Sequence, residues 1–212
     1  MLNSPVLSHP KLPSSACPKL TLASTSPFRQ QLLQKLHLPF DTAKPEVDET
    51  RLANEPVKQM VQRLSRLKAE AVANQTTNAR LVIGSDQSAV LNGEALGKPH
   101  SFEKAFEQLK AMQRQSIFFY TGLCVIDTQT GKAYEALDTT EVVFRHLSDK
   151  AIKTYLEIEQ PFNCAGSFKS EGLGITLFEA IHTQDPNALI GLPLIQLTTI
   201  LNKIGYELPI HC

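Results

Sequence analysis

The chain lacks an excess of either charge. Its 212 residues include 21 Lys or Arg and 21 Asp or Glu, so the formal net charge is zero. Proteins that bind nucleic acids or membrane surfaces by electrostatics carry a basic excess or patch. The sequence also lacks any run of the roughly 20 apolar residues that a membrane span needs. We therefore expect neither nucleic acid nor a membrane among the partners.

Cysteine is scarce, and the four cysteines are scattered at Cys17, Cys124, Cys164 and Cys212. They form no Cys-x-x-Cys pair and no Cys/His spacing typical of zinc sites. The first residues are rich in Pro and Ser and lack the continuous apolar stretch of a secretory signal. We therefore expect reduced thiols and a cytoplasmic location. We also expect residues 1–18 to be a mobile extension, and residues 19–212 to form one domain.

Two common nucleotide-binding loops are absent, since neither Gly-x-Gly-x-x-Gly nor Gly-x-x-x-x-Gly-Lys-Ser/Thr occurs. What is present is an alternation of strand-like runs with segments of helical periodicity. The expected strands include residues 19–24, 39–43, 81–83 and 116–127, and the expected helices include 27–36, 55–74, 102–112 and 194–203. This order predicts an α/β or α+β fold, a single domain with a mixed sheet flanked by helices.

The segment LVIGSDQSAV, residues 81–90, is the one around which we organise the chain. Its first three residues predict a buried strand, which we expect Gly84 to end and Ser85, Asp86 and Gln87 to follow. A carboxylate at a strand end is rigidly held yet open to a crevice, where α/β sheets bind ligands. The alternative is a strand-to-turn junction capped by Ser and Asp. Both interpretations remain open from these residues alone.

Two cations fall on predicted buried helix faces. Arg29 shares the spacing of the leucines in a helix that Ser26 caps and Pro27 begins. Lys68 is in register with the apolar face of the following helix. A buried cation needs an anionic partner. For Arg29 the partner is either a protein carboxylate or a phosphate at the helix start, and Lys68 either extends to the core edge or meets an anion in a pocket.

Three further segments have a structural and a functional interpretation each. PEVDE, residues 45–49, is either a solvated acidic turn or a magnesium site, because hard cations take oxygen ligands. Gly97 and Pro99 fix the backbone around Lys98, which is either a surface lysine or an aimed one. CAGSFKSEGLG, residues 164–174, has the glycines and alternating polar groups of a loop folded closely around a ligand.

Eight short segments occur in a distinctive order: STSPFR (24–29), PEVDE (45–49), RLSRLKA (63–69), GSDQ (84–87), GKP (97–99), FYTG (119–122), AGSFKSEG (165–172) and GLP (191–193). Together they resemble the Maf family of nucleotide pyrophosphatases over about residues 19–203. The resemblance implies a mixed α/β fold with a strongly twisted sheet and a deep nucleotide cleft, often in a homodimer. It also implies a Mg²⁺-dependent hydrolysis of a nucleoside triphosphate to the monophosphate and pyrophosphate.

The resemblance also assigns roles to particular residues. It implies that Asp86 is the general base and that Glu49 and Asp86 place the metal. It implies that four residues hold the phosphates, namely Ser24, Arg29, Lys68 and Lys98. These roles agree with the chemistry of the residues, because cations around phosphorus stabilise the charge that develops on its oxygens. A carboxylate close to water can also orient and deprotonate that nucleophile.

The resemblance also bears on which nucleotide base is recognised, because branches of the family differ at three positions. The branch active on thymidine and uridine triphosphates has Ser-Pro-Arg-Arg, Ala-Asp-Thr and a late-loop Gln. Phe28, Gln87 and Glu171 are instead similar to the branch directed to 7-methyl-GTP, although that branch usually has Trp at the Phe28 position. A cationic methylated ring gains about 0.5–2 kcal/mol on an aromatic face. A carboxylate accepts from the N1–H and N2–H edge of guanine and is left unpaired by the wrong base.

The resemblance therefore implies a cytoplasmic, magnesium-dependent 7-methyl-GTP pyrophosphatase. Two alternatives remain. One is the same chemistry on dTTP or UTP. The other is a nucleotide-binding regulator of cell division, whose site would sense a nucleotide without turning it over.

Overall fold

The computed structural model describes residues 18–75 and 80–209. The extension predicted over residues 1–18 lies outside the described residues, apart from Pro18. The helices and strands follow in chain order as β1 (Lys19–Ala23), α1 (Pro27–Gln34), β2 (Phe40–Ala43), α2 (Val57–Ala73), β3 (Arg80–Leu91), β4 (Glu94–Leu96), α3 (Phe102–Met112), β5 (Ser116–Asp127), β6 (Ala133–Phe144), α4 (Asp149–Glu159), β7 (Phe178–His182) and α5 (Leu194–Ile204). Three short 3₁₀ helices lie at η1 (Ala165–Ser167), η2 (Leu173–Leu177) and η3 (Ala188–Ile190).

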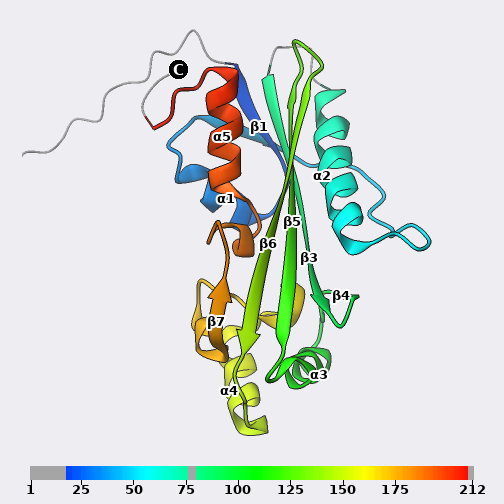
Figure 1. The fold of residues 1–212 in the computed structure, drawn as a ribbon, viewed down its shortest axis with the longest axis vertical. Coiled ribbons are helices and arrows are strands. Elements are labelled where there is room, and N and C mark those ends of the chain that lie inside the picture. The colour runs from blue at the N-terminus through cyan, green and yellow to red at the C-terminus, as the bar shows by residue number, and fades with distance from the viewer. Residues whose placement is uncertain (1–17, 76–79, 210–212) are drawn as a thin grey trace, which may run out of the picture.

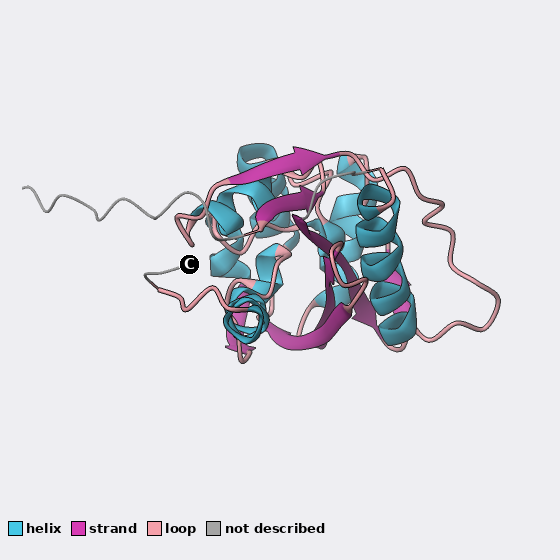
Figure 2. Cartoon of the chain, turned by 90° about the horizontal axis from the view of Figure 1, so that it is seen from above, coloured by secondary structure: helices cyan, strands magenta, loops and turns pink. Residues whose placement is uncertain are grey.

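The strands form one mixed sheet in the order β2-β1-β3-β5-β6-β7, with β4 paired to β3. β1 runs parallel to both β2 and β3, whereas the pairs β3–β5, β5–β6 and β6–β7 are antiparallel. Helices lie on both faces of the strands, as the view from above shows (Figure 2). The predicted fold class, α/β with a mixed sheet in a single domain, is confirmed.

One prediction about the central strand is wrong. Gly84 does not end it: β3 continues to Leu91 because β5 pairs antiparallel with it all along, so that Asp86 lies opposite Gly122. Asp86 is therefore in the middle of a strand and not at its end. The local polar residues suggested a turn, but the hydrogen bonds that keep this segment extended come from β5, which is distant in sequence.

The expected close backbone approach at Gly84 does occur. A Cβ at this position would lie 2.2 Å from the carbonyl oxygen of Ser65 on α2. Gly122, the partner of Asp86 on β5, is equally crowded, since its Cβ would lie 2.6 Å from the carbonyl oxygen of Val61. Glycine at both positions thus lets α2 lie directly on the sheet beside Asp86.

The long strands β3, β5 and β6 extend through two lobes (Figure 1). We call residues 18–75 and 192–209 the upper lobe, in which α1 and α5 cover one side of the strands and α2 the other. We call residues 92–118 and 144–182 the lower lobe, which contains α3, α4, β4 and β7. The lower lobe has one buried cluster and the upper lobe has two, one of them under α2, and β5 contributes to all three with Phe119, Leu123 and Cys124.

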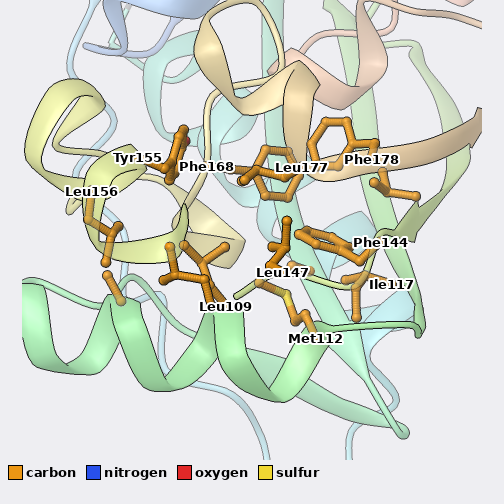
Figure 3. Packing of buried hydrophobic residues seen from close by; sticks show 14 of the residues in the cluster. Leu109, Met112, Ile117, Phe144, Leu147, Tyr155, Leu156, Phe168, Leu177 and Phe178 are labelled. Atoms are coloured by element: carbon orange, nitrogen blue, oxygen red, sulfur yellow. The ribbon is translucent and has the colours of Figure 1, made fainter. Parts of the chain in front are cut away.

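The lower cluster is rich in aromatic rings (Figure 3). Phe168 makes edge contacts with Phe119, Phe144 and Phe178, at centroid distances of 5.3, 5.7 and 4.7 Å. Aromatic pairs at such distances add to the free energy gained from burial. The ring of Phe168 therefore anchors the start of the glycine-containing loop, of which it is part, to the sheet.

Within the described ranges, no helix combines the length and apolarity needed to cross a bilayer. The two described cysteines, Cys124 and Cys164, are free thiols.

Candidate active site

One continuous cleft lies between the lobes. It consists of two adjoining cavities of about 710 and 160 Å³ whose shared lining includes Phe28, Arg29, Gln87 and Lys98. The structure brings all of the predicted site residues to this cleft: Ser24, Phe28, Arg29, Glu49, Lys68, Asp86, Gln87, Lys98 and Glu171. We call the larger cavity the charged end and the smaller one the base end.

The charged end is centred on Lys68. Its Nζ lies 2.6 Å from Asp86 Oδ1 and 3.0 Å from Glu49 Oε1. Lys68 and Asp86 are buried, with 6% and 7% of their surface exposed, whereas Glu49 reaches in from a loop and its side chain is 59% exposed. Lys68 thus extends into the cleft, and in the free protein two carboxylates supply its counter-charge.

Only the last carboxylate of the acidic segment 45–49 reaches this centre. Glu46 pairs with Lys44 on the surface, and Asp48 accepts a hydrogen bond from the backbone N–H of Thr50. The interpretation as an acidic turn therefore holds for Glu46 and Asp48, whereas Glu49 belongs to the cleft.

Glu49 and Asp86 form a carboxylate pair across one ammonium group. The described residues contain no cluster of three or more acidic, His or Cys side chains arranged for a metal. Mg²⁺ is often held by one or two carboxylates together with the phosphates of its substrate. Each carboxylate pairs with Lys68 through one oxygen, so its other oxygen would be the one to hold such an ion when it arrives with a nucleotide.

Asp86 is fixed from both faces of its strand. Its backbone N–H donates to Ser65 Oγ at 2.9 Å, and Ser65 Oγ donates in turn to the carbonyl of Val61 at 2.6 Å. On the other face, Ser85 Oγ donates to the carbonyls of Gly122 and Gly191 at 2.8 and 3.0 Å. The carboxylate at the charged end therefore stands on a rigid support.

The start of α1 forms the wall beside the charged end. Ser26 caps the helix and Pro27 is its first residue, as predicted. Ser24 Oγ is buried and accepts the backbone N–H of Ser26 at 3.1 Å. Helix starts of this kind present free N–H groups that favour anions.

Arg29 forms no ion pair within the described part of the chain; its Nε donates to the carbonyl of Gly191 at 2.9 Å. Burial lowers the pKa of its guanidinium, and the negative charges of Asp86 and Glu49 oppose that shift. Among the described residues no carboxylate pairs directly with Arg29, so its guanidinium can meet a ligand anion in the cleft.

At the base end, Gln87 is held by the loop around η3. Its Nε2 lies 2.8 and 3.0 Å from the carbonyls of Ala188 and Leu189, and 3.0 Å from Thr121 Oγ1. These acceptors fix the orientation of the amide. Gln87 also lines both cavities, so it stands where the two ends of the cleft meet.

The loop that carries Lys98 is tied to its neighbours at both sides. Gln108 Nε2 donates to the carbonyl of Gly97 at 2.9 Å, and the N–H of His100 donates to the carbonyl of Phe162 at 2.9 Å. Lys98 itself is exposed and lines both cavities. Lys98 is thus a loop lysine on a fixed backbone at the cleft, and its role in holding phosphates stays a prediction.

Glu171 lies at the far edge of the base end on an exposed turn, and Phe28 lines both ends. Sequence analysis gave no role to Lys44, Asn163 or Cys164, which also line the cleft. They lie in connecting loops without periodicity, and only the tertiary fold places such residues.

The cleft on this mixed sheet has cationic and acidic side chains at one end, and apolar and hydrogen-bonding groups at the other. Such a cleft is suited to binding a nucleoside polyphosphate. Among solved structures, the chain is similar to a HAM1 protein from Coxiella burnetii, with TM-score 0.50 and 15% identity over 88% of this chain and 100% of that one. It is similar to the Staphylococcus aureus Ham1 protein, with TM-score 0.50 and 14% identity over 88% and 99%. At such identities the likeness concerns the fold alone.

Residues 19–204 match the family described as Maf-like protein, and the chain belongs to this family. A protein of Hydrogenovibrio crunogenus named 7-methyl-GTP pyrophosphatase is 56% identical over 91% of this chain and 96% of its own length. Proteins of the same name from Nitrosococcus oceani and Pseudomonas aeruginosa are 51% and 46% identical, over 92% and 91% of this chain and 98% and 100% of theirs.

Proposed function

We propose that this chain hydrolyses the α–β phosphoanhydride bond of 7-methyl-GTP, giving 7-methyl-GMP and diphosphate. The observation that carries the proposal is one cleft with the Lys68–Asp86–Glu49 cluster at one end, Glu171 at the other and Gln87 between them. The name shared by relatives of about 50% identity over nearly their full length supports the same activity. The inferred domain is residues 19–212, with residues 1–18 as an extension.

The phosphates would lie along the charged end. Arg29 and Lys98 both face the cleft without a carboxylate partner among the described ion pairs, so a triphosphate would supply their counter-charge. Ser24 lies beside them at the start of α1 and would contribute its hydroxyl. Lys68 would remain beside Asp86, where its charge offsets that of the phosphates.

Asp86 would act as general base on the attacking water. It is buried, its carboxylate faces the cleft, and its backbone is fixed by Ser65. A water molecule held by this carboxylate could be deprotonated as it attacks the α phosphorus. We propose Mg²⁺ as the cofactor, held by Glu49 and Asp86 with the substrate; when bound, it would neutralise charge on the phosphate oxygens.

The base would lie at the smaller end of the cleft. Phe28 offers an aromatic face to the cationic methylated ring. Glu171 offers a carboxylate to the N1–H and N2–H edge of guanine, and Gln87 separates the base from the phosphates. We further propose that the protein acts as a cytoplasmic homodimer and binds neither nucleic acid nor membrane, consistent with its balanced charge.

The test is diphosphate release from 7-methyl-GTP, GTP, UTP and dTTP, each with Mg²⁺ and with a chelator. We expect Mg²⁺-dependent release from 7-methyl-GTP well above the other three. Faster release from UTP or dTTP would overturn the roles given to Phe28, Gln87 and Glu171. Tight binding of a nucleotide without release would identify a sensor, as expected for the alternative role in regulating cell division.

A further inference from the structure

A single carboxylate, that of Glu159, holds both ends of the turn that carries Glu171. Glu159 is the last residue of α4. Its Oε1 accepts from Lys169 Nζ at 3.1 Å, and its Oε2 accepts from the backbone N–H of Leu173 at 2.8 Å. Lys169 and Leu173 bracket the residues Ser170, Glu171 and Gly172, of which the first two line the base end of the cleft.

The turn lies directly against this carboxylate. A Cβ at Gly172 would lie 2.7 Å from Glu159 Oε2, so a side chain at that position would displace either the carboxylate or the turn. The hydrogen bonds from Leu173 and Lys169 lower the pKa of Glu159, because both stabilise its ionised form. The contact is therefore charged at neutral pH and depends on glycine for its closeness.

The position of Glu159 is unfavourable for the helix alone. An anion at the C-terminal end of a helix is repelled by the exposed carbonyls and the helix dipole. Lys169 offsets this repulsion, since its Nζ also donates to the backbone carbonyl of Glu159 at 2.9 Å. The loop thus supplies the cation that the helix end lacks, and the helix supplies the acceptors that the loop needs.

The other end of the loop is anchored independently. The backbone N–H of Lys169 donates to the hydroxyl of Tyr155, one turn earlier on α4, and the ring of Phe168 packs among the lower-lobe aromatics (Figure 3). The segment before Lys169 would therefore stay in place without Glu159. The turn after it is held less firmly without Glu159: Gly174 packs against the Lys169 backbone, but the hydrogen bond that closes the turn, from Gly172 N–H to Lys169 O, is long at 3.3 Å.

We infer that Glu159 is a positioning residue for base recognition: it fixes the Lys169–Leu173 turn so that Glu171 faces the base. This inference rests on the proposed function, since it assumes that Glu171 contacts the base. Glu159 itself lines neither cavity of the cleft. Its effect must therefore pass through the turn.

The first experiment compares Glu159→Ala with wild type on 7-methyl-GTP and UTP. We expect KM for 7-methyl-GTP to rise roughly tenfold with kcat within about twofold, since misplacing a recognition group weakens binding more than chemistry. The preference for 7-methyl-GTP over UTP should narrow accordingly. Glu159→Gln keeps an oxygen for Leu173 but loses the charge facing Lys169. Its KM for 7-methyl-GTP should lie between those of wild type and Glu159→Ala.

The matched control is Asp149→Asn. Asp149 is an acid at the other end of the same helix, and it forms an exposed pair with Lys110 at 3.2 Å. This variant should keep the wild-type KM and selectivity. If it changes both as Glu159→Ala does, the effect belongs to the stability of α4 and the inference is wrong.

A double-mutant cycle shows whether Glu159 acts through Glu171. In a Glu171→Gln protein, Glu159→Ala should change selectivity by less than about twofold, because the group it positions is already altered. Full, additive loss of selectivity in the double variant would contradict the inference.

Amide hydrogen exchange over residues 169–173 separates this inference from the proposed function. Glu159→Ala should speed exchange in this segment, whereas Asp149→Asn should not. If wild type cleaves none of the nucleotides while exchange responds as expected, the proposed function is wrong, but Glu159 still fixes the Lys169–Leu173 turn. If exchange in Glu159→Ala equals that of wild type, Glu159 does not fix the turn and the inference is wrong, whatever the activity.

Discussion

The two ends of the cleft are constructed in opposite ways. At the charged end, the buried Lys68 is neutralised by the buried Asp86 and by Glu49, which reaches in from an exposed loop, and α2 packs tightly on the sheet at Gly84. At the base end, apolar rings and loop groups form the wall, and Glu171 stands on an exposed turn. Under the proposed function, turnover would therefore depend on residues of a helix and a strand, Lys68 and Asp86, whereas selectivity would depend in part on the loop that carries Glu171.

This contrast also separates the expected effects of substitution. A change at Asp86 or Lys68 removes a partner of a buried charge and, under the proposed function, should lower turnover. A change at Glu171 or Lys98 acts on a group that is exposed in the free protein, so it should alter binding and selectivity more than folding.

The largest effect is expected for Asp86→Asn. Loss of the general base should lower kcat by about 10²–10⁴, while binding of 7-methyl-GTP persists. Single-turnover assays of diphosphate release measure the loss of turnover, and calorimetry of nucleotide binding measures separately whether affinity is kept. Asp41→Asn, an exposed carboxylate on the edge strand β2, is the control. Wild-type turnover in Asp86→Asn would refute the proposed base.

The next largest effect is expected at the other end, for Glu171→Gln. The amide keeps one acceptor but loses the charge, so discrimination of 7-methyl-GTP from UTP should fall by about one order of magnitude. The readout is the ratio of kcat/KM for the two nucleotides. Glu157→Gln, an exposed acid on α4, should leave the ratio unchanged. Unaltered selectivity in Glu171→Gln would remove this residue from base recognition.

The sequence predicted most of the elements and the cations of the site because local rules apply to them. Ser26 and Pro27 mark the start of α1 by capping chemistry, and helical spacing placed Lys68 on the buried face of α2. These signals depend on neighbours within a few turns. The predicted strand 116–127 coincides with β5 for the same reason, since its apolar run is continuous.

What the sequence could not provide are pairings across long separations. The extent of β3 depends on β5, and the counter-charges of Lys68 come from a loop before α2 and a strand after it. Glu159 illustrates the limit further. It was unremarkable as the end of a helix, and its role emerges only because the chain returns to it at Leu173.

A substitution at Gly84 tests whether the charged end is more rigidly supported than the base end. In Gly84→Ala the new Cβ would meet the Ser65 carbonyl at 2.2 Å, and backbone cannot move aside as a side chain tip can. We expect unfolding free energy to fall by about 1–3 kcal/mol from overpacking. Because α2 carries Lys68, turnover should fall as well.

Thermal or denaturant unfolding measures the loss, and Gly97→Ala is the control, since a Cβ there meets nothing within 4 Å. Equal stability of the Gly84 and Gly97 variants would mean that α2 is not as tightly held on the sheet as the contact implies. The rigid-support argument for the charged end would then fail.

The smallest effect concerns the loop that delivers Glu49. Arg63 on α2 donates to both carboxylate oxygens of Glu55 and to the carbonyl of Thr50, closing the loop after Glu49. The hydrogen bonds from Arg63 lower the pKa of Glu55 from 4.5 to about 2. Because the folded-state pKa is depressed, this contact stabilises the fold above about pH 4.5 and is lost as the pH falls toward 2.

The variant Glu55→Gln should therefore have a lower Tm than wild type at neutral pH, with a difference that shrinks between pH 4.5 and 2. Glu46→Gln, which breaks an exposed ion pair with Lys44 on the same loop, should show no such pH dependence. If Glu55→Gln also raises the metal concentration needed for half-maximal activity, the loop positions Glu49 for the metal. A Tm difference that does not change with pH would instead attribute the loss of stability to packing around Glu55. The Arg63–Glu55 ion pair would then not be what holds the loop at the charged end.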